Sequence, residues 1–384
     1  MNSIIIHHHV TVYIDSQGIW TQSFIAKWIN SLSPHFDRVG LLMYESPNKL
    51  TKHDTLIEQR NVFLESLGTI GRTWDRFRRI RRIKIICNEI SSKYSSLLIR
   101  GITPRGYTVY KYTLVSNKYF LMVGSLEDSR PNFNFKNVYK YVMYYIRRNE
   151  LKLMSLHSVC LCNSKKVARE LKEYTNKDVY FSPTSSISEK DIRPFNLKLL
   201  AQNEINVIFC GRITTEKGVI ELFEAIGLLN ARGSRRYKLT MVGSVEDSVE
   251  SELKYIASNF DFADSVDWLG FIPFGEHLLD IISSMDFCIL PSYHEGFPHI
   301  IWEAGICSVP MITTNVGGIQ DLVSESEVTF IRKKSAESIY DEVLELISDY
   351  ELRRQRAVNL YELACKATLE RNAEILVSTI NRIF

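Results

Sequence analysis

Hydrophobic and polar positions follow two alternating patterns along this chain. Short apolar runs closed by turn residues are separated by stretches in which apolar residues recur every three or four positions, the spacing of one helix face. The apolar runs that we interpret as strands in the first half are 10–15, 38–44, 61–66, 95–102, 118–125 and 159–164. Strands that alternate with helices favour a parallel sheet covered by helices.

The same alternation resumes in the second half. Strands are predicted to end at Gly211, Gly243 and Leu290, and the chain after Asp321 is expected to be helical as far as Phe384. The two halves meet around residues 185–204. We therefore predict an α/β protein with two Rossmann-like domains, at 1–190 and 200–365. The helix 137–156, which is rich in Tyr, is interpreted as a core helix.

The stretch from Met285 to Gly318 combines a buried strand, a polar turn, a helix that begins near Pro298 and a second strand that ends at Asn315. A loop between a strand and a helix lies at the carboxyl edge of a parallel sheet, where ligands bind. Glu295 lies in this loop, and Glu303 follows eight positions later in the helix. The two carboxylates are placed to accept hydrogen bonds from sugar hydroxyls, and the first turn of the helix offers free N–H groups.

A second candidate site follows the strand that ends at Gly211. Arg212 and Lys217 lie in a polar loop, and a helix is predicted from Gly218. A guanidinium fork and an ammonium group beside a helix start favour phosphate oxygens. Two cations in a loop are also compatible with an ordinary solvated surface.

The motif HEGFPHIIWEAGICSVPMITTNVGGIQDLV (294–323) resembles the donor-site signature of family 4 retaining glycosyltransferases. The matching residues are Glu295, Gly296, Phe297, Pro298, Glu303, Ala304, Gly317 and Gly318. Arg212 and Lys217 match the family's G-R-x4-K-G spacing. The alternative is that both Glu side chains only complement a helix dipole and a solvated face.

The resemblance implies roles for these residues. Arg212 and Lys217 would hold the donor diphosphate and, together with Glu295, are the candidate catalytic residues. Glu303 would bind the ribose, and the family's Leu-Gly-Phe turn implies contacts of Gly270 and Phe271 with the nucleobase. The remaining donor-binding candidates are the loop residues Gly296, Phe297 and Pro298.

The resemblance also implies the GT-B architecture, in which two Rossmann-like domains face a central cleft. The helix 366–384 would then cross back to an acceptor-side first domain. Gly18 and Thr21 are weak candidates for an acceptor or phosphate loop, because the turn that is Gly-rich in the family contains only one glycine here. Ser125 stands where members often carry a His, and SPTSSIS replaces an Asn-Gly turn at the junction.

Composition changes this picture little. With 384 residues and 45% apolar content, the chain has room for two cores, and no apolar run is long enough to span a bilayer. The N-terminus has no signal-peptide pattern, so we expect a cytoplasmic protein. Seven Cys without C-x-x-C favour buried thiols, and His7 to His9 are not expected to form a metal site. No Asp-x-Asp triplet is present, and we expect neither metal nor cofactor.

Charge is divided unevenly. Residues 1–195 hold 30 Lys and Arg against 16 Asp and Glu, whereas the remainder holds 17 against 28. Segment 72–84 interleaves cations with Trp74, Phe77, Ile80 and Ile83 at helical spacing. Such a helix either binds an anionic membrane surface, as a peripheral protein of the inner face does, or buries its stripe under a solvated basic face. Nucleic acid is a weaker interpretation because no nucleic-acid-binding module accompanies the charge.

The resemblance implies a retaining glycosyltransferase of the hexosyltransferase type. It would move a sugar from a nucleoside diphosphate to a hydroxyl of a glycan or lipid-linked glycan, in bacterial surface polysaccharide assembly. Two alternatives stay open. One is a nucleotide-sugar epimerase of the same fold, and the other is a catalytically silent GT-B protein that binds donor or assembly partners.

Overall fold

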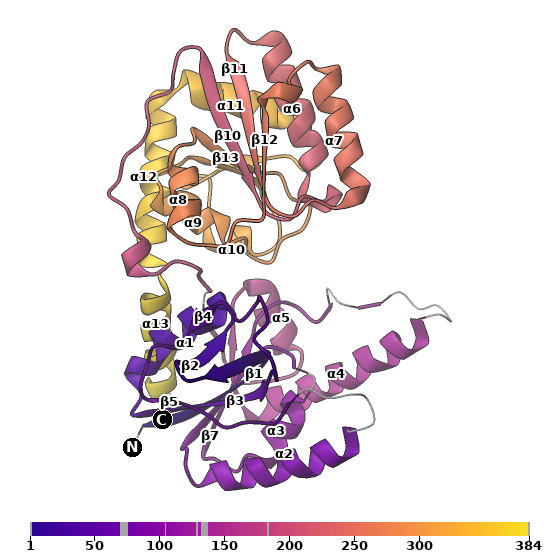
Figure 1. Ribbon diagram of the computed structural model, residues 1–384, viewed down its shortest axis with the longest axis vertical. Coiled ribbons are helices and arrows are strands. Elements are labelled where there is room, and N and C mark those ends of the chain that lie inside the picture. Colours follow the sequence, from indigo (N-terminus) through magenta and orange to yellow (C-terminus); the bar gives the residue numbers. More distant parts are fainter. Residues whose placement is uncertain are drawn as a thin grey trace. The chain divides into compact units, whose positions relative to one another are not determined.

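The computed structural model describes residues 2–69, 76–103, 105–127, 130–131, 137–182 and 184–382. The chain divides into two compact units (Figure 1). The first unit comprises 1–184 and 369–384, and the second comprises 185–368. Residues 185–190, which the sequence analysis assigned to the first domain, therefore belong to the second unit.

A mainly parallel sheet forms the centre of the first unit. Its parallel strands are arranged in the order β5-β3-β1-β6-β7-β8-β9. Their bounds are β1 (Ser3–Asp15), β3 (Arg38–Glu45), β5 (Val62–Leu64), β6 (Ser96–Arg100), β7 (Asn117–Met122), β8 (Val159–Cys162) and β9 (Val179–Phe181). The strand order reverses direction between β1 and β6, which is a topological switch point.

The first strand differs from the prediction. Strand β1 begins at Ser3, seven residues before the predicted start, and the parallel register to β3 shifts between His7 and Thr11. The later part of β1 pairs antiparallel with β2 (Gly18–Thr21), which in turn pairs with β4 (Thr55–Leu56). A hairpin therefore comes between β1 and α1 (Ser23–Leu32).

Helices cover both faces of this sheet. Helix α1 and the C-terminal α13 (Leu369–Arg382) bury apolar residues in one cluster, including Ile25, Ile29, Leu376 and Ile380. A second cluster takes side chains from the other four helices of the unit. These are α2 (Arg76–Ser91), α3 (Gly106–Tyr112), α4 (Val138–His157) and α5 (Lys165–Lys172). Helix α5 begins after Ser164, whose hydroxyl accepts the N–H of Val167 at 3.2 Å.

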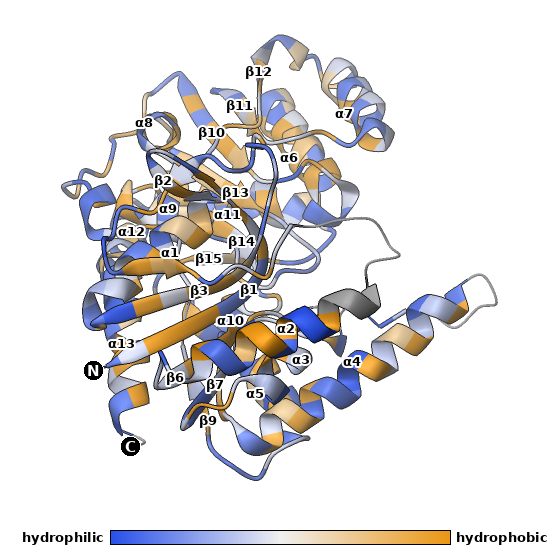
Figure 2. Ribbon diagram, turned by 60° about the horizontal axis from the view of Figure 1, so that its bottom comes forward, coloured by the Kyte–Doolittle hydropathy of each residue, from blue (hydrophilic) through white to orange (hydrophobic). Residues whose placement is uncertain are grey.

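The two basic helices of the first unit differ in what they expose. Arg72 and Trp74 lie outside the described residues. Further along α2, Ile83 is buried in the core and Arg81 is exposed, which favours the solvated basic face. In α4 the prediction of a core helix is wrong for its first half. That half leaves five large apolar or aromatic residues exposed (Figure 2): Val138, Tyr139, Val142, Tyr145 and Ile146.

The second unit contains a fully parallel sheet in the order β12-β11-β10-β13-β14-β15. The strands are β10 (Glu204–Cys210), β11 (Arg236–Val242), β12 (Val266–Gly270), β13 (Phe287–Leu290), β14 (Met311–Thr314) and β15 (Thr329–Ile331). In chain order this is the 3-2-1-4-5-6 arrangement of dinucleotide-binding folds, with its switch point between β10 and β13. Strand β15 corrects the expectation that the chain after Asp321 is only helical.

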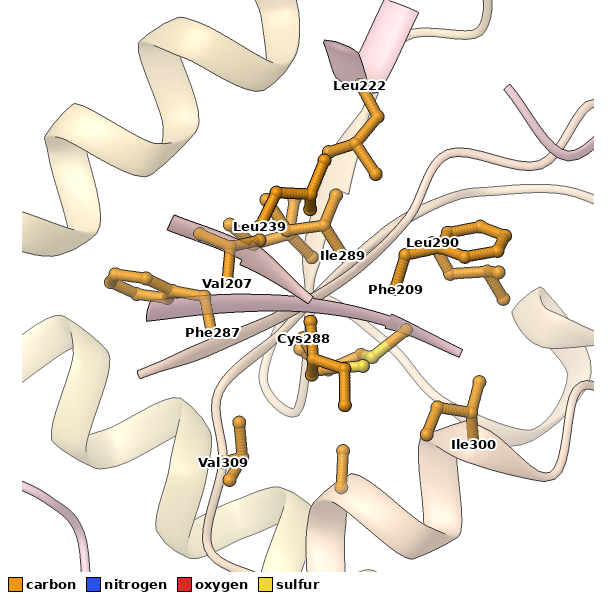
Figure 3. Packing of buried hydrophobic residues seen from close by; sticks show 14 of the residues in the cluster. Val207, Phe209, Leu222, Leu239, Phe287, Cys288, Ile289, Leu290, Ile300 and Val309 are labelled. Atoms are coloured by element: carbon orange, nitrogen blue, oxygen red, sulfur yellow. The ribbon is translucent and has the colours of Figure 1, made fainter. Parts of the chain in front are cut away.

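Apolar side chains of β10 and β13 pack on both faces of the second sheet (Figure 3). Helix α6 (Val219–Arg232) contacts both α7 (Asp247–Asn259) and α11 (Ala336–Ser348). Helix α9 (Ile300–Ile306) contacts both α8 (Glu276–Ser283) and α12 (Tyr350–Lys366). The short α10 (Ile319–Leu322) follows β14. All seven residues of α9 are buried, so the helix that carries Glu303 is fixed in the core.

Candidate functional site

Two loops meet at the switch point of the second sheet. One follows β10 and carries Arg212 and Lys217, and the other follows β13 and carries Glu295. The backbone N–H of Tyr293 donates to the carbonyl of Glu216 at 2.8 Å. Gly218 adopts φ +68°, and a Cβ there would overlap the carbonyl of Pro291. The close approach requires glycine and holds the two loops in one arrangement.

An ion pair joins the two loops. The Lys217 ammonium lies 2.5 Å from Oε1 of Glu295, and the two side chains are 19% and 9% exposed. The Ser292 hydroxyl donates to the same carboxylate oxygen at 2.7 Å. The sequence analysis placed this Lys and Glu in one donor site, and the structure brings them into contact. Ser292 was missed, because a Ser after a strand has no distinguishing pattern.

The Gly-Gly loop after β14 packs on the Glu295 loop. The N–H of Gly318 donates to the carbonyl of Gly296 at 2.7 Å. Gly317 has φ +56°, and a Cβ there would overlap the carbonyl of Glu295. The Phe297 ring packs against Trp302 of α9 with centroids 4.7 Å apart. The motif residues thus form one rigid layer at the carboxyl edge of the sheet.

Glu303 is held near the end of β10. It is 6% exposed, and its Oε1 accepts a hydrogen bond from the Ser186 hydroxyl at 3.0 Å. Burial raises the pKa of Cys210 to about 12, and the negative charge of Glu303 contributes to this rise. Ser186 lies in SPTSSIS, the segment that departs from the family's turn. Its contact with Glu303 was not predicted from the sequence.

The other predicted donor residues are more exposed. Arg212 is exposed and forms no ion pair within the part of the chain that the structure describes. Gly270 ends β12 at φ +67°, and its carbonyl accepts the N–H of Gly243 at 2.8 Å. Phe271 follows with 76% of its surface exposed. Pro298 precedes α9, which begins two residues later than predicted, at Ile300.

The candidates in the first unit have other surroundings. Gly18 begins β2, and the buried Thr21 hydroxyl donates to the carbonyl of Thr11 at 3.1 Å. Ser125 donates to Glu170 at 2.6 Å. Gly18 and Thr21 are the first and last residues of the short strand β2, and α1 begins two residues after Thr21.

Chemical features outside these loops are few. Across the described segments, no group of three or more His, Cys, Asp or Glu is placed to hold a metal ion. All seven cysteines are free thiols, and Cys288 and Cys307 are buried. No helix among the described residues has the length and apolar character needed to cross a bilayer.

The arrangement in the second unit suits an anionic, hydroxyl-rich ligand. Lys217 and Arg212 supply positive charge for phosphate oxygens, and the carboxylates of Glu295 and Glu303 accept hydrogen bonds from hydroxyls. A fixed cation and fixed acceptors at a switch point can orient a nucleotide without large rearrangement.

Comparison with known proteins supports this interpretation. Residues 193–362 match the family model of glycosyl transferases group 1. The chain is 32% identical over 163 residues to the capsular polysaccharide biosynthesis glycosyltransferase CapM of Staphylococcus aureus, a match that covers 41% of this chain and 40% of CapM.

A longer but weaker match extends into the first unit. The N,N'-diacetylbacillosaminyl-diphospho-undecaprenol alpha-1,3-N-acetylgalactosaminyltransferase of Campylobacter jejuni is 23% identical over 260 residues. This match covers 66% of this chain and 63% of that protein. The chain thus spans well under two thirds of CapM and somewhat less than two thirds of the Campylobacter protein.

The whole chain has a known fold. Anabaena Alr3699/HepE in complex with UDP and glucose matches with a TM-score of 0.69 and 14% identity, covering 99% of this chain and 100% of that one. At this identity the likeness concerns the fold alone. The predicted GT-B fold class and the resemblance to group 1 glycosyltransferases are confirmed.

Proposed function

We propose that this protein is a retaining glycosyltransferase, because residues 193–362 match the family model of glycosyl transferases group 1. It takes a sugar from a nucleoside diphosphate and transfers it to an acceptor hydroxyl. The observation that carries the proposal is the contact between Lys217 and Glu295 at the switch point of the second sheet. These residues come from two motifs 78 positions apart, and the fold brings them together.

The cations stabilise the leaving group. When the bond between sugar and diphosphate breaks, negative charge grows on the phosphate oxygens and positive charge on the sugar. Lys217 and Arg212 are the basic residues of the loop that follows β10, and their charge offsets the growing negative charge without a metal ion. Lys217 exchanges its contact with Glu295 for a contact with the diphosphate when the donor binds.

The carboxylates hold the hydroxyl groups. Glu303, kept in place by the buried helix α9 and by the Ser186 hydroxyl, accepts hydrogen bonds from the ribose. Once Lys217 moves to the diphosphate, Glu295 and the backbone of Gly296 and Phe297 orient the donor sugar. The turn at Gly270 and Phe271 faces the nucleobase through its backbone.

The leaving phosphate oxygen is the base in this scheme. It accepts the acceptor proton on the face from which it departs, so the new glycosidic bond forms on that same face. The anomeric configuration is then retained. NMR of the product tests this step, and a product of inverted configuration would refute it.

We infer that the acceptor is a glycan or a lipid-linked glycan in polysaccharide assembly. The support is the relatives: CapM is named for capsular polysaccharide biosynthesis, and the Campylobacter protein for a diphospho-undecaprenol acceptor. The excess of cations in residues 1–195 agrees with an anionic partner.

We propose a membrane surface as a further partner, with the first half of α4 as a contact. The exposed apolar residues of α4 lie beside the exposed cations Lys140 and Arg147, and the beginning of α4 projects from the first unit (Figures 1 and 2). Apolar residues enter the headgroup region while cations attract anionic lipid. Vesicle flotation with anionic lipid tests it: Val142→Asp should abolish binding, and unchanged flotation would refute α4 as the contact.

Turnover of the donor decides between the enzyme and its alternatives. The wild type and Lys217→Ala should be incubated with UDP-, GDP-, ADP- and CMP-sugars and a membrane extract. Release of nucleotide that depends on the extract supports a transferase. Isomerised sugar nucleotide without any acceptor identifies an epimerase, and binding without turnover identifies a silent protein.

A further inference from the structure

The first unit contains a buried guanidinium that has no acidic partner. Arg100 is the last residue of β6 and is 8% exposed, and its Nε has no hydrogen-bond partner. None of the ion pairs found in the described part of the chain involves it. Burial lowers the pKa of Arg100 to about 10, so the group stays charged at neutral pH. A buried charge without a partner is unfavourable in the free protein.

The position of Arg100 in the sheet suits a ligand. Strands β1 and β6 are neighbours at the switch point of the first sheet, and His7 lies opposite Ile99 in their register. Arg100 follows immediately, where β6 ends. In open α/β sheets this is the edge at which ligands bind. The proposed donor loops lie at the equivalent edge of the second sheet.

A second donor shares an aromatic neighbour with Arg100, because the His8 ring centroid lies 6.4 Å from that of Phe24. His8 Nδ1 accepts the backbone N–H of Val10 at 3.1 Å, which places the proton of the neutral ring on Nε2. Nε2 has no hydrogen bond among the described residues. Burial, followed by the charge of Arg100, lowers the pKa of His8, so the ring is neutral at pH 7. The ring of His9 stacks on His8 with centroids 4.3 Å apart.

Aromatic rings hold the guanidinium but do not satisfy its N–H groups. The Arg100 Cζ lies 4.8 Å from the centroid of Trp28 and 5.8 Å from that of Phe24. Stacking on the ring faces fixes the guanidinium plane and leaves its edges free for an acceptor. Phe24 is 47% exposed, so this aromatic wall reaches the solvent.

We propose that Arg100 and His8 form an oxyanion site, which takes a phosphoryl or carboxylate group of the sugar acceptor. The guanidinium edge offers a charged fork, and the imidazole Nε2–H adds a neutral donor. The assignment to the acceptor rests on the proposed function, because the donor loops lie in the other unit. An anion would supply the charge that the sequence itself does not place beside Arg100.

Anion-dependent stability tests the site without any turnover. The melting temperatures of the wild type, Arg100→Met and Arg81→Met should be measured in sodium chloride and in methyl phosphate at equal ionic strength. Arg81 is an exposed cation of α2 and serves as the matched control. We expect methyl phosphate to raise the melting temperature of the wild type and of Arg81→Met by several degrees. The gain of Arg100→Met should be clearly smaller, because only the phosphate-binding loop of the second unit remains. An equal gain in all three proteins would overturn the proposal.

The wild type alone provides a second test if Arg100→Met does not fold. The Nε–H signal of Arg100 should be followed by NMR during titration with methyl phosphate and with methyl glucuronide, and the probe that shifts it identifies phosphoryl or carboxylate chemistry. Where a variant folds, Arg100→Lys keeps the charge but loses the guanidinium fork, and it should weaken binding about tenfold. An unchanged Arg100 signal with both probes refutes the site. Nucleotide binding to the wild type and to Glu303→Ala is measured separately. It tests the proposed donor site, so a failure of the anion site and a failure of the proposed function can be told apart.

Discussion

At the scale of single residues, the account rests on a few contacts within the second unit. Lys217 and Glu295 lie 2.5 Å apart, and Glu303 is buried with a hydroxyl donor at 3.0 Å. These side chains are largely shielded from water, so their electrostatic interactions with a ligand are stronger than those of exposed groups.

Lys217→Ala should lower the rate of donor turnover by about 10²–10³-fold, because a charge on the leaving group is lost in the transition state. The control is Lys238→Ala, which removes a Lys from an exposed pair with Glu204. A steady-state assay of nucleotide release measures both variants. Equal rates for the two would remove Lys217 from the mechanism.

Ser186→Ala should weaken nucleotide binding by about two- to tenfold, because its hydroxyl holds the carboxylate of Glu303. Ser185→Ala is the matched control from the same segment, since that hydroxyl accepts the N–H of Ile187 instead. Calorimetric titration with the nucleotide measures both. A Ser185→Ala effect as large as that of Ser186→Ala would contradict the specific role.

The motif residues could be predicted from the sequence because they form a set with fixed order and spacing. Ser186 and Ser292 could not, because Ser in a loop is common and only the fold shows which carboxylate it meets. The strand that contains Gly18 and Thr21 could not be predicted, since it pairs with the distant residues 55–56.

At the scale of elements, the loops after β10, β13 and β14 act as one layer. Their packing depends on glycines where the backbones meet. Strand positions were predictable where a clear apolar run occurs, and β3 (Arg38–Glu45) matches the predicted run 38–44 to within one residue. Strand β15 was missed because it has three residues, and the exposure of α4 was missed because periodicity gives no information on which faces are covered.

Gly317→Ala tests this layer. The Cβ would overlap the carbonyl of Glu295 at a positive φ, so the variant should lose about 1–3 kcal/mol of unfolding free energy and bind nucleotide more weakly. Gly275→Ala is the control, because nothing lies within 4 Å of its added Cβ. Urea unfolding measures the difference, and equal stability of both variants would contradict the packing role.

At the scale of the whole molecule, the chain ends in the unit where it begins. Helix α13 follows α12 in sequence, yet its apolar residues belong to the core of the first unit and those of α12 to the core of the second. We therefore expect a core substitution in α13 to destabilise the first unit, and a core substitution in α12 to destabilise the second.

Leu376→Ala in α13 should destabilise the first unit by about 2–5 kcal/mol, and Leu360→Ala in α12 the second by a similar amount. Hydrogen exchange resolved along the chain measures the two effects separately. The expected result is faster exchange of β1, β3 and β6 for Leu376→Ala, and of β10, β13 and β14 for Leu360→Ala. The opposite assignment would refute the division into units.

The most direct test of the central claim is a thermal-shift measurement with UDP-, GDP-, ADP- and CMP-sugars without added metal. It compares the wild type with Glu303→Ala and with the surface variant Lys238→Ala. The account predicts that one nucleotide raises the melting temperature by several degrees in the wild type and in Lys238→Ala, and that Glu303→Ala loses this shift. A full shift in Glu303→Ala, or none with any nucleotide in the wild type, would contradict the donor site described at this edge of the second sheet.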